Sequence, residues 1–419
     1  MRKLPVAIRL SVCALVLGLS AAHPDAFALS PERFSFVSLH PAGAVASRAV
    51  AVSGGQQVGD VVVSGEAAGL SAKAMIMVGG GVAIDPSSRA ALWRGTAASR
   101  VLLEETLLSQ AYSIFGNAQG GAVNDLAALW SGTAASGSFL LVDTAAQYTG
   151  GHVRGISNGW QAGEAGYAGG AAGHYRAALW HAASNPDAYP AILHFGGTDD
   201  NSIVWGIDGA TAATPGQQAG AATVDGSLHA ILWNGSAAAY VDLHPAGGVS
   251  SQAYALHGGR QAGYVDVGGD ALRATVWQGT AASAIELHPA GMADSLAFAL
   301  RDNWVAGDVY PTDDPNSRRA LLWNLNDRGN PIDLSALMPV NYVYAAARGI
   351  DADPTGRLSI VGMAFNTQTS AVEAVMWTYD PPAAAGVPGL STAAMAALIV
   401  LLMVLGGWSV RTPGRNGWR

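Results

Sequence analysis

The pentapeptide His229-Ala230-Ile231-Leu232-Trp233 is one of seven related apolar runs in this chain of 419 residues, each ending in tryptophan. The copies end at Trp93, Trp130, Trp180, Trp233, Trp277, Trp323 and Trp377, at successive spacings of 37, 50, 53, 44, 46 and 54 residues. Spacings in this range are typical of repeat architectures, in which one unit cannot bury its apolar face without a neighbour. The fold is therefore expected to be built from about seven similar units.

Each unit contains three further short runs besides the one that ends in tryptophan. In one well-preserved copy these are residues 241–247 (VDLHPAG), 253–256 (AYAL) and 261–265 (QAGYV), and glycine or proline separates them. Within the tryptophan run, Ala230 and Leu232 share one face of a strand while Ile231 and Trp233 share the other. Both faces are apolar, as expected for a sheet that lies between two other sheets.

Four short strands in about 45 residues are the signature of a propeller blade. The sequence predicts an all-β fold, a β-propeller of about seven four-stranded blades, with a C-terminal transmembrane helix. Six or eight blades stay open, because the first unit carries about 20 extra residues around 65–88. A flat solenoid is the rival fold, but a closed ring leaves fewer exposed sheet edges.

The two ends of the chain differ in composition from the repeats. Residues 1–28 combine a basic start, an apolar stretch and Ala26-Phe27-Ala28, which is typical of a signal peptide. The repeat domain is expected over 29–380, followed by a linker at 381–389. Residues 390–410 are expected to form a transmembrane or sorting helix, and 411–419 a basic cytoplasmic tail. The chain is therefore expected to be exported, and either anchored in the membrane at the cell surface or released to the extracellular space.

The segment Val387-Pro388-Gly389-Leu390-Ser391, with its apolar helix and arginines, resembles bacterial C-terminal sorting signals of the PEP-CTERM and IPTL-CTERM types. The resemblance implies recognition by a C-terminal sorting protease, with Val387, Pro388, Leu390 and Ser391 as signal residues. A plain membrane anchor through residues 390–410 is the alternative.

The repeated pattern of A-x-A-L/I, a glycine turn, V/A-G and then H/R-A-x-L-W resembles the bacterial extracellular repeats of the HAF family. The match spans most of residues 34–380. It implies a secreted or surface-displayed bacterial protein, and it implies no reaction, because the family has no established catalytic residues.

The charge of the chain excludes one class of partner. The formal net charge is −8, and without the two ends 16 basic residues face 29 acidic ones, a net charge of −13. Nucleic-acid binding depends on clustered Lys and Arg, so no nucleic-acid partner is expected.

Two patterns suggest chemistry and have a simpler structural interpretation. His40, His244 and His288 share the context Leu-His-Pro-Ala-Gly, which would suit metal ligands if they converged, but each is more simply the end of a strand before a proline turn. The segment 155–159 fits the G-x-S-x-G pattern of a nucleophile elbow, yet it falls where other copies have a plain turn. No catalytic residue and no cofactor-binding residue is expected.

Acidic turns and aromatic side chains supply the remaining candidates. Weak calcium sites are suggested by oxygen donors gathered in turns, although none has the full spacing of a calcium loop, at Asp199, Asp200, Asp313, Asp314, Asp351 and Asp353. Aromatic residues outside the tryptophan runs would either stack on a ligand or pack between blades, namely Tyr148, Trp160, Tyr175, Trp205, Trp304 and Tyr310.

The functional expectation is a non-enzymatic secreted or surface-anchored repeat protein that presents propeller loops for binding or for contact with matrix or surface. Its partner would be a surface ligand, a glycan or a protein. The alternative is a polysaccharide-acting hydrolase or lyase with an axial active site, which would need carboxylates or histidines from different blades to meet.

Overall fold

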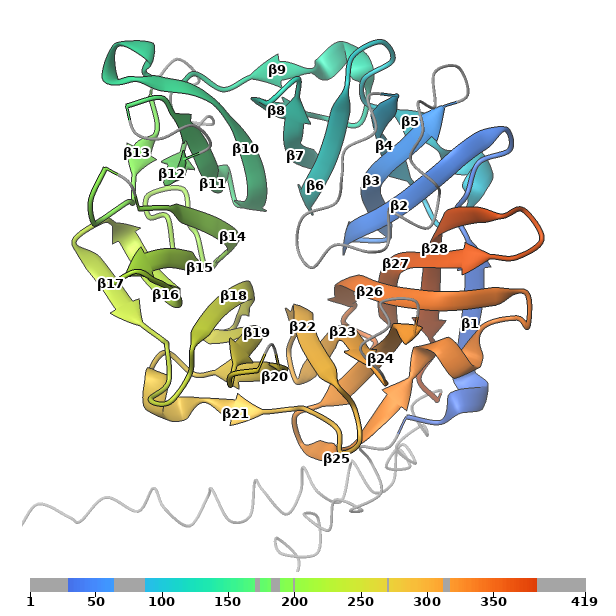
Figure 1. Cartoon of the computed structure of the whole chain (residues 1–419). Coiled ribbons are helices and arrows are strands. Elements are labelled where there is room, and N and C mark those ends of the chain that lie inside the picture. The colour runs from blue at the N-terminus through green and yellow to red at the C-terminus, as the bar shows by residue number, and fades with distance from the viewer. Residues whose placement is uncertain are drawn as a thin grey trace, which may run out of the picture. The chain divides into compact units, whose positions relative to one another are not determined.

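The computed structural model describes residues 29–63, 87–169, 174–181, 189–198, 200–269, 271–311 and 317–382. These residues form seven four-stranded antiparallel sheets arranged in a ring (Figure 1). The predicted β-propeller of seven four-stranded blades is confirmed. The solenoid and the six- and eight-bladed alternatives are wrong for the described residues.

Blades 1 to 6 each use four consecutive strands, from the innermost to the outermost. Blade 1 comprises β2 (Ala44–Ser53), β3 (Gln56–Val63), β4 (Ser88–Trp93) and β5 (Val101–Leu102). Blade 2 comprises β6 (Ser109–Phe115), β7 (Ala118–Val123), β8 (Leu126–Trp130) and β9 (Ser138–Phe139). Blade 3 comprises β10 (Tyr148–Ser157), β11 (Trp160–Tyr167), β12 (His174–Trp180) and β13 (Ala191–Ile192).

The second half of the ring follows the same order. Blade 4 comprises β14 (Ser202–Asp208), β15 (Gln217–Val224), β16 (Ser227–Ser236) and β17 (Ala239–Asp242). Blade 5 comprises β18 (Ser250–His257), β19 (Arg260–Asp266), β20 (Leu272–Trp277) and β21 (Ile285–Glu286). Blade 6 comprises β22 (Asp294–Arg301), β23 (Trp304–Tyr310), β24 (Arg319–Asn324) and β25 (Asp327–Asp333).

Blade 7 closes the ring with strands from both ends of the domain. It contains β26 (Tyr342–Ala352), β27 (Leu358–Asn366) and β28 (Ala371–Tyr379), and its outermost strand is β1 (Phe34–Ser38). β1 pairs with β28 in the register Phe34 to Tyr379 through Ser38 to Val375. The sequence repeat thus begins with the outer strand of the preceding blade, so the two ends of the domain must meet to complete one sheet.

Six short 3₁₀ helices lie in the described connections: η1 (Pro31–Arg33), η3 (Ala97–Ser99), η4 (Ala134–Ser136), η5 (Thr144–Ala146), η6 (Ala281–Ser283) and η8 (Leu334–Leu337). Three of them, η3, η4 and η6, are the repeated Gly-Thr-Ala-Ala-Ser turn between the third and fourth strands. In η6 the Ser283 hydroxyl donates to the Thr280 carbonyl oxygen at 2.6 Å and accepts from the Gln278 backbone N–H at 2.8 Å. This bonding explains why the turn sequence recurs.

The apolar core lies between blades, with one tryptophan at each junction. Trp277 of blade 5, for example, packs with Leu232 and Leu243 of blade 4, and all three are at most 3% exposed. The equivalent clusters at the other six junctions contain Trp93, Trp130, Trp180, Trp233, Trp323 and Trp377. A blade therefore buries its tryptophan only when its neighbour is folded, as the repeat pattern predicted.

The predicted transmembrane helix at 390–410, the linker beyond Pro382, the sorting-signal residues and the signal peptide at 1–28 lie outside the described residues. Within the described part of the chain, no helix is long and apolar enough to cross a membrane.

Candidate functional site

Every innermost strand carries a β-bulge at the same place, and a glycine faces it from the second strand. In blade 4 the register shifts between Val204 and Gly206, so that Trp205 is the extra residue, while Val204 pairs with Gly220. A Cβ atom at Gly220 would lie far inside van der Waals contact of the Ile203 carbonyl oxygen. The same close approach of an inner-strand carbonyl occurs at Gly59, Gly121, Gly163, Gly263, Gly307 and Gly362. Glycine is thus required opposite each bulge.

The seven bulge residues share an environment. Each is partly exposed and follows a buried residue on an innermost strand, and β-bulges are known to re-aim a side chain in this way. We call them the axial belt: Val50, Tyr112, Arg154, Trp205, Tyr254, Phe298 and Arg348. Their strands are the ones nearest the axis of the ring (Figure 1).

The aromatic and arginine members of the belt contact one another from blade to blade. The Arg154 guanidinium carbon lies 4.2 Å from the ring centroid of Tyr112 and 5.0 Å from that of Trp205. Trp205 meets Tyr254 edge-on with centroids 5.5 Å apart, and its Nε1 donates to the Gln252 side chain at 3.2 Å.

The contacts continue on the other side of Tyr254. Tyr254 stacks on Phe298 with centroids 4.9 Å apart and an interplanar angle of 24°. The Arg348 guanidinium carbon lies 3.7 Å from the Phe298 centroid. Six of the seven belt residues therefore form an unbroken series of cation–π and aromatic contacts, with an arginine before and after the aromatic triad.

Buried carboxylates on the second strands neutralise the belt arginines. Arg154 Nη2 donates to Glu164 at 2.7 Å, and His152 Nδ1 lies 2.6 Å from the same oxygen. Arg348 Nη1 donates to Asp308 at 2.7 Å. Both carboxylates directly follow a bulge glycine and have side chains at most 2% exposed.

The electrostatics keep the pair of Arg154 and Glu164 ionised. Burial alone would raise the pKa of Glu164, but Arg154 and His152 outweigh it and hold that pKa below its ordinary value. Burial alone would lower the pKa of Arg154, yet Glu164 raises it above the usual value. Burial raises the pKa of Tyr112 and Tyr254, so both phenols stay neutral. Arg154 and Glu164 therefore stay charged, and Tyr112 and Tyr254 neutral, at neutral pH.

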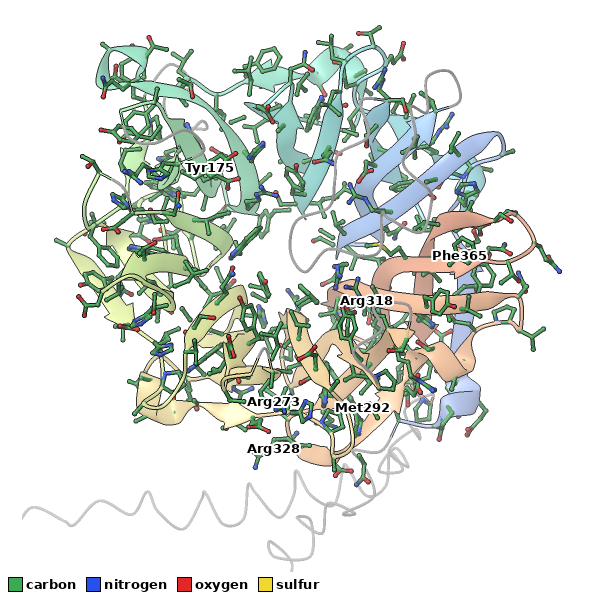
Figure 2. All side chains as sticks on the ribbon, viewed as in Figure 1. Tyr175, Arg273, Met292, Arg318, Arg328 and Phe365 are labelled. Carbon is green, nitrogen blue, oxygen red and sulfur yellow. The ribbon has the colours of Figure 1, made fainter. Side chains whose placement is uncertain are left out.

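Both belt arginines keep donors that the protein does not use. Among the described residues, Nη1 of Arg154 and both Nε and Nη2 of Arg348 have no hydrogen-bond partner. Arg318, the labelled arginine nearest the axis in Figure 2, also faces Asp308, with 3.6 Å between Nε and the carboxylate. Burial lowers the pKa of Arg318 to about 10. The unused guanidinium N–H groups of the belt can donate to a ligand.

The histidines of the Leu-His-Pro-Ala-Gly motif join neighbouring blades. His244 Nδ1 bonds the Ser251 hydroxyl at 2.9 Å, and that hydroxyl accepts from the Ala230 backbone N–H of the preceding blade at 2.9 Å. His40 with Ser47 and His288 with Ser295 repeat the arrangement, each at 2.8 Å. We call each such histidine–serine pair a blade latch, and its role is structural.

The structure contains a fourth latch that the Leu-His-Pro-Ala-Gly motif did not predict. His194 Nδ1 lies 2.8 Å from the Ser202 hydroxyl, which accepts from the Ala177 N–H. His194 is followed by phenylalanine where the other three copies have proline. Among the described residues, no group of three histidine, cysteine, aspartate or glutamate side chains is placed to hold a metal.

The G-x-S-x-G segment is a hairpin turn. Ser157 ends β10, and Asn158 and Gly159 have φ values of 44° and 86° in the turn to β11. This left-handed pair is typical of a two-residue hairpin. The structural interpretation of this segment is therefore confirmed.

The calcium candidates that the structure describes bond to the protein separately. Asp200 accepts from the Gly197 N–H at 2.6 Å, Asp351 from the Gly54 N–H at 2.8 Å, and Asp353 from the Thr355 N–H at 2.8 Å. Their carboxylates serve three different turns and are not brought together. Asp199, Asp313 and Asp314 lie outside the described residues.

Of the six aromatic candidates, Trp205 alone belongs to the axial belt. Trp160 donates to the Thr211 carbonyl oxygen at 2.9 Å, and Trp304 packs in the core between blades 6 and 7. Tyr148 contacts Tyr167, and Tyr310 contacts Arg318. Tyr175 is 42% exposed, and its ring centroid lies 6.5 Å from that of His152. Figure 2 places Tyr175 on blade 3.

Comparison with known proteins gives likeness at the level of fold. No protein-family model matches the chain, and no curated protein sequence matches it. A puromycin-hydrolysing peptidase from Mycobacterium tuberculosis aligns at 12% identity with a TM-score of 0.47, over 81% of this chain and 52% of the peptidase. This chain thus spans about half the length of that enzyme.

Two further solved structures show the same kind of similarity. The β-propeller domain of the trilobed protease from Pyrococcus furiosus aligns at 10% identity with a TM-score of 0.46, over 80% of this chain and all of that domain. A TolB protein from Agrobacterium tumefaciens aligns at 12% identity with a TM-score of 0.39, over 67% of this chain and 94% of that one. Identities this low establish a shared architecture alone.

These neighbours correct the functional expectation drawn from the sequence. They are propellers of peptidases and TolB, and not surface repeat proteins or polysaccharide-acting enzymes. The expectation of a non-enzymatic surface repeat protein that presents its loops is therefore wrong, and so is its alternative of a polysaccharide hydrolase or lyase. That expectation rested on the signal-peptide pattern, the repeat body and the expected anchor at the C-terminus, whereas the propeller itself is a scaffold that many functions share.

Proposed function

We propose that this protein is a ligand-binding β-propeller that holds an extended peptide segment against the axial belt. The observation that carries the proposal is the unbroken series of contacts from Tyr112 to Arg348 across six innermost strands. Residues that serve packing recur from blade to blade in this chain, whereas the belt residues differ while occupying one structural position. Recognition sites are built from such variation on a rigid scaffold.

The chemistry of the belt fits a peptide better than a polyanion. Glu164 neutralises Arg154, and Asp308 is shared by Arg348 and Arg318, so these buried carboxylates offset most of the positive charge at the belt. Their unused N–H groups remain directed donors, which suit backbone carbonyl oxygens. The aromatic rings of Trp205, Tyr254 and Phe298 lie between the two arginines. Their faces suit proline and other apolar side chains, as in aromatic-lined peptide grooves.

The proposal assigns binding to the propeller and no bond-breaking step, and it includes no cofactor. The absence of enzymatic activity stays a prediction. It is tested by incubating the protein with the peptides it binds and checking their masses for cleavage.

The binding test uses the full-length protein and an immobilised library of proline- and aromatic-rich peptides, followed by calorimetry on the best sequences. Trp205→Ala and Phe298→Ala are expected to weaken binding at least about tenfold, because each removes an aromatic face. Phe115→Ala is the matched control, since Phe115 ends the innermost strand β6, is 46% exposed and lies outside the belt. Absence of any peptide ligand, or equal affinity of the belt and control variants, would overturn the proposal.

We also propose that the chain is exported, on the grounds of the signal-peptide pattern in residues 1–28. The HAF resemblance and the sorting signal at Val387, Pro388, Leu390 and Ser391 belong to the same proposal. Mass spectrometry of the protein from its host is expected to give a mature N-terminus at Leu29. An intact Met1 in the purified protein would contradict export through this signal.

A further inference from the structure

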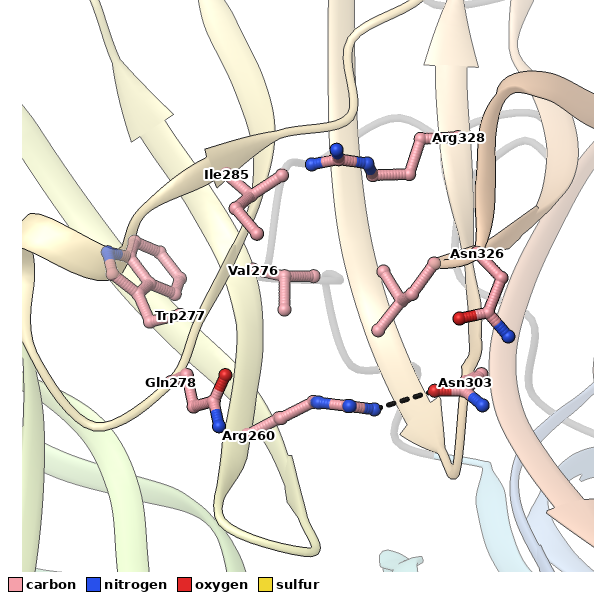
Figure 3. A pocket seen from close by; sticks show the side chains of 9 residues that line it. Arg260, Val276, Trp277, Gln278, Ile285, Asn303, Asn326 and Arg328 are labelled. Carbon is pink, nitrogen blue, oxygen red and sulfur yellow. Dashed lines mark hydrogen bonds between the residues drawn. The ribbon is translucent and has the colours of Figure 1, made fainter. Parts of the chain in front are cut away.

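A cavity of about 200 Å³ lies at the outer rim between blades 5 and 6, away from the axial belt. Its lining comes from β19, β20 and β21 of blade 5 on one side, and on the other from β25 and two hairpin turns of blade 6 (Figure 3). Its apolar lining consists of Val276, Trp277, Ile285 and Leu325, and its polar lining of Arg260, Gln278, Asn303, Asn326 and Arg328.

The cavity lies where blade 6 departs from the repeat turn. Blades 1, 2 and 5 join their third and fourth strands through the Gly-Thr-Ala-Ala-Ser turn. In blade 6 the third strand runs on to Asn324, which pairs with Asp327 across a tight hairpin containing Leu325 and Asn326. The regular turn of blade 5 thus meets an irregular one, and the two leave space between them.

Two arginines border this space and no acidic residue lines it. Arg260 donates from Nη1 to the Asn303 side chain at 2.8 Å, the bond drawn in Figure 3. Arg328 is exposed, and Figure 3 shows its guanidinium reaching over the cavity toward Ile285. Within the part of the chain that the structure describes, Arg328 forms no hydrogen bond or ion pair. A pocket with two positive charges and none negative stands out in a chain of net charge −8.

We propose that this inter-blade pocket binds a carboxylate attached to an apolar group of about the size of a benzene ring or a leucine side chain. Arginine pairs with carboxylates through two parallel N–H bonds, which makes a free guanidinium beside amide groups a selective anion site. A cavity of about 150 Å³ lined by apolar side chains is known to hold benzene, so the volume here suits one such group. Ile285, 39% exposed, and Val276 would cover its apolar part.

Two sources would supply this chemistry, a free small acid and the C-terminal residue of a peptide. The test measures binding of phenylacetate and of the peptide acetyl-Ala-Ala-Phe to the full-length protein by calorimetry. Each is paired with its neutral amide, phenylacetamide or the C-terminal amide of the peptide. Binding of either acid at least about tenfold more tightly than its amide supports the proposal, and the acid that binds better identifies the source. Equal affinity for acid and amide, or no binding of either acid, overturns it.

Variants separate this pocket from other cationic positions. Arg328→Glu is expected to lower the affinity for the acid at least about tenfold, since it replaces the free guanidinium with a like charge. Arg94→Glu is the control. Arg94 is an exposed arginine that directly follows Trp93, the residue of blade 1 that corresponds to Trp277 of the pocket. Ile285→Phe fills the apolar part without changing charge, and is also expected to abolish binding. An Arg328→Glu or Ile285→Phe protein that binds the acid like the wild type contradicts the assignment.

The axial belt supplies an independent internal check. Trp205→Ala is expected to leave acid binding in the inter-blade pocket within about twofold of the wild type, because the two sites share no residue. Loss of acid binding in Trp205→Ala with retention in Arg328→Glu would place the acid at the belt and not in this pocket.

Discussion

Blade 4 contains two tryptophans that differ in burial and in whether the other blades repeat them. Trp233, on the third strand, is fully buried in the junction with blade 3 and has a counterpart in every blade. Trp205, on the innermost strand, is partly exposed, and the other blades place valine, tyrosine, arginine or phenylalanine at its position. The backbone is equally constrained at both places, by strand pairing at one and by the bulge and its glycine at the other.

The difference separates packing from recognition in this chain. A position that must fill the space between blades keeps one residue type, because all junctions have the same geometry. A position on an innermost strand whose backbone is fixed but whose side chain is partly exposed is free to differ from blade to blade. Constancy among the copies therefore marks the core, and variation at a fixed backbone position marks the candidate site.

The two tryptophans should differ in what their loss costs. Trp233→Ala is expected to lower the free energy of unfolding by about 3–5 kcal/mol, because it opens a large cavity in a junction. Trp205→Ala should lower it by about 1 kcal/mol, since the indole is already partly hydrated. Urea denaturation followed by far-ultraviolet circular dichroism measures both. Equal destabilisation by the two substitutions would remove the distinction between core and belt.

The glycine opposite a bulge tests whether the belt depends on the backbone beneath it. Gly220→Ala is expected to cost about 3 kcal/mol, because its Cβ would overlap the Ile203 carbonyl oxygen and force the strands apart. Gly329→Ala is the control, since Gly329 has no atom within 4 Å of the added Cβ, and it should change stability by at most about 0.5 kcal/mol. Calorimetric melting compares the two. A Gly220→Ala protein as stable as Gly329→Ala would show that the bulge is not held by this approach.

The sequence predicted the ring more fully than the belt, for a physical reason. Apolar runs such as 229–233 report burial, which short-range alternation reveals, and so the seven blades could be counted. The sequence did not distinguish Trp205 from Trp160 or Trp304. A bulge is a shift in the pairing of one strand with another, and the sequence of a single strand does not reveal that pairing. The signal was present in the V/A-G dipeptide of six second strands and in the Gly-Gly of β7, where the second residue faces the bulge, but its meaning required the register.

Contacts between different blades were the other part that the sequence could not supply. Arg348 and Asp308 are 40 residues apart and meet because blades 6 and 7 are neighbours in the ring. His194 was missed because its copy of the motif lacks the proline that marked the other three. Residues that meet only because the ring closes leave no local pattern in the sequence.

The blade latches join neighbouring blades at four junctions, and removing one should have a moderate effect. Ser251→Ala deletes the hydroxyl that accepts from Ala230 N–H and bonds His244, leaving a buried N–H without a partner. The expected loss is about 2 kcal/mol in the free energy of unfolding. Ser53→Ala is the control, because among the described residues the Ser53 hydroxyl makes no hydrogen bond. A loss at Ser251 no larger than that at Ser53 would contradict the latch.

The smallest effect is expected from pH, and it comes from the same histidines. Burial lowers the pKa of His40, His194, His244 and His288 below the ordinary value of 6.5. The unfolded chain therefore binds protons more readily than the folded ring, so stability is full above about pH 6.5 and falls as the pH drops through that value. Melting temperatures between pH 7.5 and 5 should decrease, and His244→Gln should decrease less steeply because one of the four groups no longer titrates. At pH 7.5 these histidines are unprotonated, so a difference in melting temperature between the wild type and His244→Gln reports the lost hydrogen bonds. An unchanged slope in His244→Gln would mean that acid sensitivity arises outside the latches.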